Sequence, residues 1–512
     1  MSSLRKPRSA RSRRQFLKTA AGAALGAGLV SPAPGAAAAA PLTPPGVDAD
    51  LRLLPPPAPP PHAPESVRWS QVRDAFGLPR DYIHMNTGTT GSQPLFSLHN
   101  QQVYNRYKLR DPRDWEARLA ADQPDRFPLR DGSSVTARQA RIAAMYGADP
   151  DEIVLSYNTT DACAMVFAGT PWRPGDRIVT TTFEHPALAG PIAWARDNRG
   201  VDVTLVDIPS RLTPDHTVDD VLAWFEPALA APRPAGSKQY LMFSEIFYRN
   251  GLRMPVRELC ALARRHGAFT LVDTAHGWGM LPIDCHEYGA DFIAGAGHKW
   301  LCGGPGTGIL YVRTTGADRH PLPPCAPAGF ASYGNLFDAP SSFHDNRTWS
   351  PAVALQGRGE INTPALLAMT DSAAFFAEVG VPDIYRRGVG LGRRLKDGIL
   401  AKWGPRALWV DPGEAAFATA LTSFNPFAGN EDPARFAEQK KAIVGILDAL
   451  AAESPKIYIR AATWRSRADA AADDRIGLRI STHGMYNDAD EVDHVLARVI
   501  AQVERSGLAQ VS

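Results

Sequence analysis

Short apolar runs of the strand type alternate with segments of helical periodicity from residue 82 to residue 312. In the helical segments apolar residues recur every three or four positions, the spacing of an amphipathic helix. The strand-like runs lie at 82–85, 152–157, 177–181, 203–206, 240–243, 269–272, 291–294 and 308–312. The helical segments lie at 95–108, 135–146, 162–169, 218–229 and 256–266. This alternation predicts an α/β fold with a mostly parallel, mixed sheet between crossover helices.

The pattern changes after residue 343. The predicted elements there are helices at 365–379, 388–402 and 488–505 and strands at 417–424, 457–461 and 476–480. They suit a smaller α+β domain, and 512 residues are more than one core usually fills. We expect a large domain at 66–345, an active-site loop and connecting helix at 346–380, and a small C-terminal domain at 381–512.

The N-terminal 40 residues carry seven basic residues and no acidic one. Arg13 and Arg14 precede a short apolar stretch at 19–30 and small residues at 36–40, a pattern that resembles a twin-arginine export signal. The apolar stretch is short for a membrane span, which needs about 20 residues. We therefore expect a signal peptide at 1–40, export to the periplasm or the medium by the twin-arginine machinery, and no stable membrane anchor. A basic tail or an uncleaved anchor is the alternative.

The amino-acid composition and the charge distribution give three further expectations. Residues 41–65 are rich in proline and are expected to form a linker. The net charge is +2, but the basic excess lies in the N-terminal segment, so no basic patch indicates nucleic acid. The five cysteines form no CxxC pair and no metal-ligand spacing, so we expect no metal site.

Residues with a carboxylate, an imidazole or an amine side chain follow two neighbouring strands. Asp273 and His276 follow the run at 269–272, and His298 and Lys299 follow the run at 291–294. Ligands of open α/β sheets bind outside the carboxyl ends of the strands, so these side chains are expected to converge. An amine that forms an imine and a carboxylate that pairs with a pyridinium nitrogen are what pyridoxal 5′-phosphate requires. We therefore predict Lys299 as the Schiff-base lysine and Asp273 as the partner of the ring nitrogen.

Three further turns could complete such a site. Asn158, Thr159 and Thr160 stand between a strand and a helix, where they can cap the helix or hold the cofactor phosphate. His185 follows the strand at 177–181, where an imidazole can stack on a planar ring, although a lone histidine is more often a turn or core residue. The turn at 86–91 is rich in glycine and small polar residues, which let backbone N–H groups approach a ligand; Asn86 is our candidate there for substrate binding.

Arg479 is the candidate for the substrate carboxylate. Apolar residues alternate with polar residues or glycine at 475–481. Arg479 is therefore expected on the face of its strand opposite to the apolar one. A guanidinium in that position can grip a carboxylate with two hydrogen bonds, and a surface salt bridge is the alternative.

The chain resembles class V aminotransferases, a fold-type-I pyridoxal-phosphate family that includes isopenicillin-N-epimerase-like proteins, cysteine desulfurases and kynureninases. The matching segments are 182–187, 272–276, 297–300, 304–308 and 475–487. The resemblance implies a homodimer in which Lys299 forms the imine, Asp273 pairs with the pyridine nitrogen and His185 stacks on the ring. It implies that His276 contacts the ring hydroxyl, that His298 lies beside the phosphate, and that Thr363 reaches the phosphate of the partner subunit.

Some positions depart from the family pattern. Ala296 stands where a phosphate-binding Ser or Thr is common. A cysteine desulfurase needs a nucleophilic cysteine shortly before the arginine that binds the substrate, and residues 332–512 contain none, so that activity is disfavoured. The glycines at 303–308 are not followed by Gly-Lys-Ser/Thr and are expected to form a turn, not a nucleotide loop.

The predicted function is chemistry at the Cα of an amino acid. Aminotransferase is the default that the family resemblance gives, and an epimerase or a lyase is the alternative. A binding module that kept the fold would not be expected to retain Lys299, Asp273 and His276 together. Nothing in the sequence identifies the substrate.

Overall fold

The computed structural model describes residues 51–58, 65–127, 134–314, 355–356 and 359–511. The predicted signal peptide, most of the proline-rich linker and most of the loop at 346–363 therefore lie outside the described residues.

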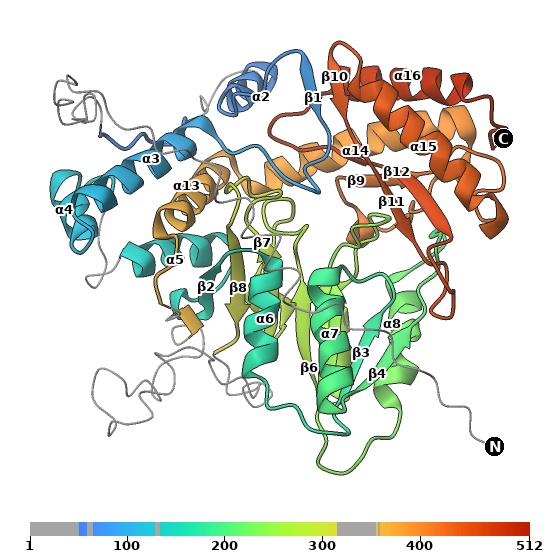
Figure 1. Ribbon diagram of the computed structural model, residues 1–512, viewed down its shortest axis with the longest axis horizontal. Coiled ribbons are helices and arrows are strands. Elements are labelled where there is room, and N and C mark those ends of the chain that lie inside the picture. The colour runs from blue at the N-terminus through green and yellow to red at the C-terminus, as the bar shows by residue number, and fades with distance from the viewer. Residues whose placement is uncertain (1–50, 59–64, 128–133, 315–354, 357–358, 512) are drawn as a thin grey trace, which may run out of the picture. The chain divides into compact units, whose positions relative to one another are not determined.

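A seven-stranded sheet forms the centre of the fold, as the strand–helix alternation predicts (Figure 1). Its strands are β2 Ile153–Ser156, β3 Arg177–Thr181, β4 Asp202–Val206, β5 Gln239–Ser244, β6 Ala268–Asp273, β7 Phe292–Ala296 and β8 Gly308–Val312, in the order β2-β8-β7-β6-β5-β3-β4. The pairs within β7-β6-β5-β3-β4 are parallel, whereas β8 runs antiparallel to both of its neighbours. The predicted mostly parallel, mixed α/β sheet is confirmed.

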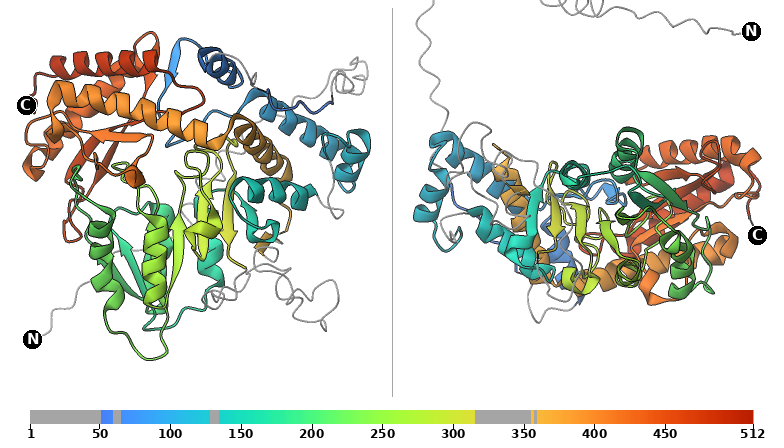
Figure 2. Two further views of the ribbon diagram at one scale, coloured as in Figure 1. Left: turned by 180° about the vertical axis from the view of Figure 1, so that it is seen from behind. Right: turned by 90° about the horizontal axis from the view of Figure 1, so that it is seen from below.

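Helices cover both faces of this sheet because successive side chains of each strand point to opposite faces. On β5, Tyr240 and Met242 pack with α6 (Thr159–Gly169) and α7 (Pro186–Arg199). The intervening Leu241 and Phe243 pack on the other side with α8 (Val218–Ala230) and α9 (Val256–Arg265). Figure 1 shows α6 and α7 in front of the sheet, and the view from behind in Figure 2 brings α8 and α9 forward. Both faces being buried explains why these strands read as continuous apolar runs.

A second, smaller sheet is built from the C-terminal part of the chain. It is antiparallel, in the order β11 (Arg460–Trp464), β12 (Arg475–Ser481) and β9 (Leu421–Phe424). Apolar residues of α14 (Val381–Trp403), α15 (Phe436–Ala451) and α16 (Ala489–Arg505) pack with it in one core. The predicted strand at 417–424 is shorter than expected, since 415–417 form a 3-10 turn. The predicted strand at 457–461 divides into β10 (Lys456–Tyr458) and β11.

The N-terminal strand β1 (Tyr82–His84) joins the C-terminal part of the fold. It pairs in parallel with β10 (Lys456–Tyr458), and Ile83 and Met85 lie in the same core as the small sheet. This pairing brings the turn at 86–91 beside the carboxyl ends of the central strands. The remaining helices are α2 Glu65–Asp74, α3 Leu95–Arg110, α4 Trp115–Asp122, α5 Ser134–Met145, α10 Cys285–Tyr288 and α13 Thr363–Val379.

Among the described residues, no single helix has the length and apolar character of a membrane span. The helices α13 and α14 meet that test only as a pair, with a bend of 81° between them.

Candidate active site

A cavity of about 530 Å³ opens at the carboxyl ends of the central strands, against the β11–β12 hairpin. Seven residues proposed from the sequence line it together: Asn158, Thr159, Thr160, His185, His298, Lys299 and Arg479. They come from four separate segments of the chain, so the fold assembles the site that the strand ends predict.

Lys299 and Asp273 form the centre of this site. Asp273 ends β6 and pairs in register with Ala294 of the adjacent β7, after which the chain turns to present Lys299. Asp273 is buried, and its Oδ1 accepts a hydrogen bond from the Ala275 N–H at 2.9 Å. Burial lowers the pKa of Lys299 to about 8, against the opposing effect of Asp273 and with the help of Arg479 and Arg460. The amine is therefore available as a nucleophile near neutral pH.

The same burial acts on the Asp273 carboxyl. Desolvation raises its pKa, while the charge of Lys299 and the Ala275 N–H act in the opposite direction. A cation placed against this carboxylate gains an interaction that water screens little, because the group is removed from solvent. This is the environment that a protonated ring nitrogen requires.

The turn before α6 has the geometry of an anion site. Asn158 is the N-cap of the helix, and its side chain accepts from the Asp161 N–H at 2.9 Å. Thr159 and Thr160 begin the helix, where main-chain N–H groups point outward and the helix dipole is positive. A Cβ on Gly308 would lie 2.8 Å from the main chain of Asn158, so the glycine is required for β8 to pass so close to this turn.

His185 also lines the cavity, where it caps the N-terminus of α7. Its Nδ1 accepts from the Ala187 N–H at 3.1 Å, and its ring meets Tyr248 edge to face with 4.8 Å between centroids. Burial and then the positive charge of Lys299 lower the pKa of His185 to about 4. The ring is therefore neutral at physiological pH, which suits stacking on a planar ring better than an imidazolium would.

Arg479 is buried, with 3% of its surface exposed. Its Nη1 donates to the Tyr248 carbonyl at 2.8 Å, and its Nη2 donates to Asn86 Oδ1 at 3.0 Å and Thr89 Oγ1 at 2.9 Å. All three acceptors are neutral, and its Nε has no hydrogen-bond partner among the described residues. Arg479 is thus held in place at the cavity wall by neutral groups, and no carboxylate among the described residues forms an ion pair with it.

Besides the buried Asp273, three further residues proposed from the sequence are not among those that line the cavity. Asn86 is fully buried behind Arg479, which it orients, whereas the sequence suggested direct substrate contact. His276 is buried and accepts from Trp300 Nε1 at 3.1 Å, with its Nε2 unpartnered among the described residues. Thr363 begins α13 after the cap residue Asn362, and its proposed role toward a partner subunit stays a prediction.

Sequence reasoning did not find five polar residues that also line the cavity: Tyr248, Arg249, Arg460, Thr463 and Asp473. Tyr248 and Arg249 follow β5, so the rule that applied to Asp273 and Lys299 could have found them. Arg460 and Asp473 belong to the β11–β12 hairpin and its loop, and only the packing of the small sheet brings them here.

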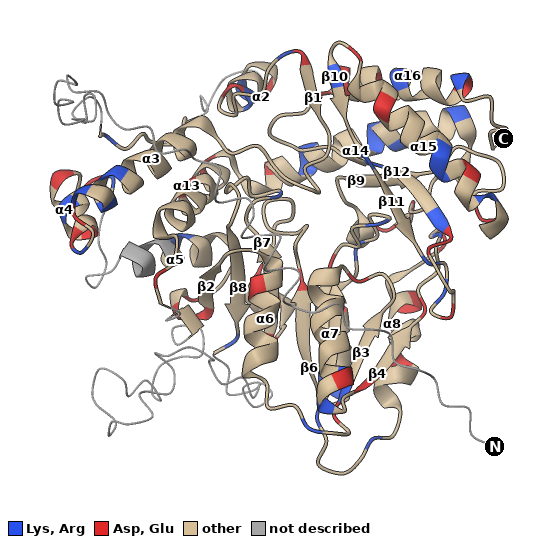
Figure 3. Ribbon diagram, in the orientation of Figure 1, with Lys and Arg blue, Asp and Glu red and all other residues tan. Residues whose placement is uncertain are grey.

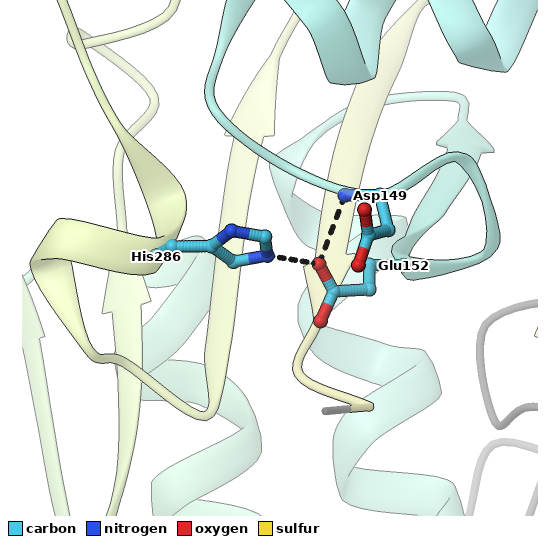
Figure 4. A group of neighbouring side chains, drawn as sticks. All are labelled: Asp149, Glu152 and His286. Carbon is cyan, nitrogen blue, oxygen red and sulfur yellow. Dashed lines mark hydrogen bonds and ion pairs between the residues drawn. The ribbon is translucent and has the colours of Figure 1, made fainter. Parts of the chain in front are cut away.

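Figure 4 shows a cluster of possible metal ligands outside this site, Asp149, Glu152 and His286. His286 Nε2 lies 2.6 Å from Glu152 Oε2, which also accepts from the Asp149 N–H at 3.0 Å. The other oxygen of Glu152 accepts from the Thr314 N–H at 3.0 Å. Since the carboxylate is fully buried and already saturated by these donors, the cluster is explained as a hydrogen-bonded closure between α10 and the start of β2.

The residues present fit pyridoxal 5′-phosphate. The anion turn, the buried carboxylate, the amine and the neutral His185 all border one cavity or lie directly beneath it. The unpartnered Nε2 of buried His276 is a further polar atom that a ligand hydroxyl would satisfy. Fold and site together define a pyridoxal-phosphate enzyme of fold type I.

Residues 132–495 match the family model "Aminotransferase class-V", and the chain belongs to that family. Isopenicillin N epimerase of Streptomyces clavuligerus is 29% identical over 248 residues, which are 48% of this chain and 56% of that protein. A probable chloroplastic L-cysteine desulfhydrase of Arabidopsis thaliana is 27% identical over 308 residues, 57% of this chain and 61% of that protein. The chain therefore matches little more than half the length of these relatives.

Solved structures show the same fold. A cysteine desulfurase from Thermococcus onnurineus NA1 superposes with a TM-score of 0.64 at 20% identity, covering 86% of this chain and 98% of that one. A C-DES mutant with glycine covalently linked to its PLP cofactor gives a TM-score of 0.62 at 20% identity, covering 83% and 98%. The prediction of pyridoxal 5′-phosphate as cofactor is confirmed.

Proposed function

We propose that the protein acts at the Cα of an α-amino acid as an aminotransferase. The observation that carries this proposal is the placement of the Lys299 amine and the Arg479 guanidinium on the walls of one cavity, above the buried Asp273. An amine that can move a proton and a cation that can hold a carboxylate are the two groups that such a substrate requires.

Each residue of the site has a separate role in the proposed reaction. When bound, pyridoxal phosphate supplies an electron sink for the pair left at Cα. Asn158, Thr159 and Thr160 hold the phosphate, and Asp273 holds a proton on the ring nitrogen. Arg479 fixes the α-carboxylate, so that the Cα–H bond is oriented toward the Nζ of Lys299, which takes the proton and returns it at a different carbon.

Epimerisation is the second candidate, because the relatives by sequence include two isopenicillin N epimerases at 29% and 28% identity. It differs from transamination in where the proton returns, namely to the opposite face of Cα. A lyase of the desulfhydrase kind would instead expel a side-chain group. Desulfurase activity is disfavoured, because the four described cysteines are all buried and residues 332–512 contain none.

The first test is the absorbance spectrum of the purified protein given pyridoxal phosphate. We expect an imine band that the Lys299→Ala variant lacks. Borohydride should abolish this band by reducing the imine to a secondary amine, which leaves the cofactor covalently attached to Lys299. Lys440→Ala, an exposed lysine on α15, is the matched control and should keep the band. A wild-type protein without a Lys299-dependent band would refute the proposal.

The second test separates the reactions by incubation with L-amino acids in deuterated water. Deuterium exchange at Cα together with a 2-oxo acid product supports transamination. Exchange with accumulation of the D-enantiomer would favour epimerisation, and release of a side-chain fragment would favour a lyase.

Export and dimerisation belong to the same proposal. The twin-arginine pattern supports export of the folded, loaded enzyme, and changing Arg13 and Arg14 to lysine should retain the protein in the cytoplasm. Family resemblance supports a homodimer in which Thr363 contributes to the partner's phosphate site. Analytical ultracentrifugation of the loaded protein tests this, and a strict monomer would contradict it.

A further inference from the structure

Two arginines lie directly opposite each other at the cavity wall. In the antiparallel pairing of β11 with β12, Arg460 is the register partner of Arg479, and both side chains line the cavity. Directly opposed residues share one face of a sheet, and like charges in that arrangement destabilise it. The destabilisation is greater here because Arg479 is buried. The pair therefore implies an anionic ligand.

No carboxylate among the described residues forms an ion pair with either of these two arginines. Arg460 Nη1 donates a hydrogen bond to the neutral Thr89 hydroxyl at 3.3 Å. Arg249, on the same cavity, lies 3.6 Å from Asp473, the only acidic residue among the described residues that line the cavity. Three guanidinium groups thus share one carboxylate. Figure 3 shows the basic positions of the β11–β12 hairpin beside the central sheet.

Two buried arginine N–H donors at this cavity wall make no hydrogen bond with the described residues. The Nε atoms of Arg249 and Arg479 are both buried and lack a hydrogen-bond partner among the described residues. Buried donors are nearly always satisfied, so each of these points to a group that arrives with the ligand. The α-carboxylate of the substrate can satisfy Arg479, and Asp473 lies beside Arg249, but no carboxylate among the described residues that line the cavity is left for Arg460.

We propose that the substrate is an α-amino acid with a second carboxylate on its side chain, and that Arg460, assisted by Arg249, binds this second carboxylate while Arg479 binds the first. The proposal rests on the proposed function, since it assigns the α-carboxylate to Arg479. In the proposed function the cofactor phosphate is held by the turn before α6, so we assign the anion that Arg460 requires to the substrate and not to the cofactor.

The experiment compares charged substrates with neutral ones of the same shape. L-Glutamate is compared with L-glutamine, and L-aspartate with L-asparagine, by the spectral change of the holoenzyme on binding. Glutarate and butyrate serve as unreactive probes in calorimetry of the same protein. A charge-assisted hydrogen-bonded contact changes affinity by about 10- to 100-fold, so we expect the dicarboxylic member of each pair to bind more tightly by that factor.

The variant Arg460→Gln should reduce this preference to about threefold or less. Arg467→Gln is the matched control, because Arg467 lies beyond β11 in the same hairpin, pairs with Asp469 and is exposed; it should keep the full preference. Equal binding of charged and neutral ligands by the wild type would overturn the proposal, as would an unchanged preference in Arg460→Gln. Failure of the proposed function is seen separately, as the absence of a Lys299-dependent imine band.

Discussion

Asn86 Oδ1 accepts a hydrogen bond from Arg479 Nη2 at 3.0 Å, across 393 positions of sequence. The contact exists because β1 pairs with β10 and so brings the turn at 86–91 beside β12. Thr89 of the same turn accepts from the same nitrogen at 2.9 Å. An N-terminal turn therefore holds the C-terminal arginine that is proposed to bind the substrate.

Replacing Asn86 with alanine should weaken substrate binding through Arg479. A hydrogen bond to a charged group contributes about 1.5–3 kcal/mol, so we expect KM to rise by about 10- to 100-fold. The imine band should persist, because Asn86 does not touch the cofactor residues. Asn198→Ala, on the exposed end of α7, is the control. An Asn86→Ala variant with wild-type KM would show that Arg479 does not need this support.

Imine formation should depend on pH with a midpoint near 8. At pH 7 about 9% of an amine with a pKa of 8 is neutral, against about 0.03% for an amine with the ordinary value of 10.5. The rate at which the apoprotein captures pyridoxal phosphate should therefore rise with pH and level off above about 8. Stopped-flow absorbance measures this. In Arg460→Gln the midpoint should move upward, because a positive charge that lowers the pKa of Lys299 is removed; a rate that still rises at pH 10 in the wild type would contradict the shift.

Glu184 should make stability fall as pH rises. It is buried between Thr181 Oγ1 at 2.7 Å and Ser244 Oγ at 2.6 Å, and burial raises its pKa to about 8. Below about pH 4.5 the carboxyl is protonated in both the folded and unfolded states. Between about pH 4.5 and pH 8 unfolding releases this proton. The free energy of unfolding therefore falls by about 1.4 kcal/mol per pH unit because of this group.

The variant Glu184→Gln keeps both hydroxyl contacts without a titrating group. Its free energy of unfolding in urea, relative to the wild type, should therefore increase from pH 5 to pH 8. A difference between the two proteins that is constant across this range would show that Glu184 is already ionised in the folded state.

Gly91 should be essential for the position of Lys299. Its N–H donates to the His298 carbonyl at 2.8 Å, and a Cβ at this position would lie 2.0 Å from the Lys299 main-chain oxygen. Gly91→Ala must displace one of these segments, at a cost of about 1–3 kcal/mol, and should slow cofactor capture. In Gly190→Ala, by contrast, the added methyl group has nothing within 4 Å and stabilises α7 by about 0.5–1 kcal/mol. Equal behaviour of the two variants in thermal unfolding and cofactor capture would refute this reasoning.

Helix α7 illustrates why some elements escaped prediction. Pro186 and Pro191 lie within Pro186–Arg199 and obscure a helical pattern. The helix forms nonetheless because Leu188 and Ile192 bury against the large sheet, and such packing outweighs local propensity. The sequence predicts that the glycine-rich turn at 86–91 approaches a ligand; at Gly91 the structure shows a close approach to the backbone of Lys299 instead.

Local patterns along the chain are enough to predict the large sheet, the position of Lys299 beside Asp273 and the helix-capping turn at 158–160. Parallel strands end at one edge of a sheet, so residues that follow buried strands are placed by local pattern alone. Local pattern does not predict that Asn86 lies behind Arg479, that His276 is withdrawn from the cavity wall, or that Arg460 and Asp473 belong to the site. These placements depend on β1 pairing with β10 and on the small sheet packing over the large one, contacts between distant segments that no local periodicity encodes.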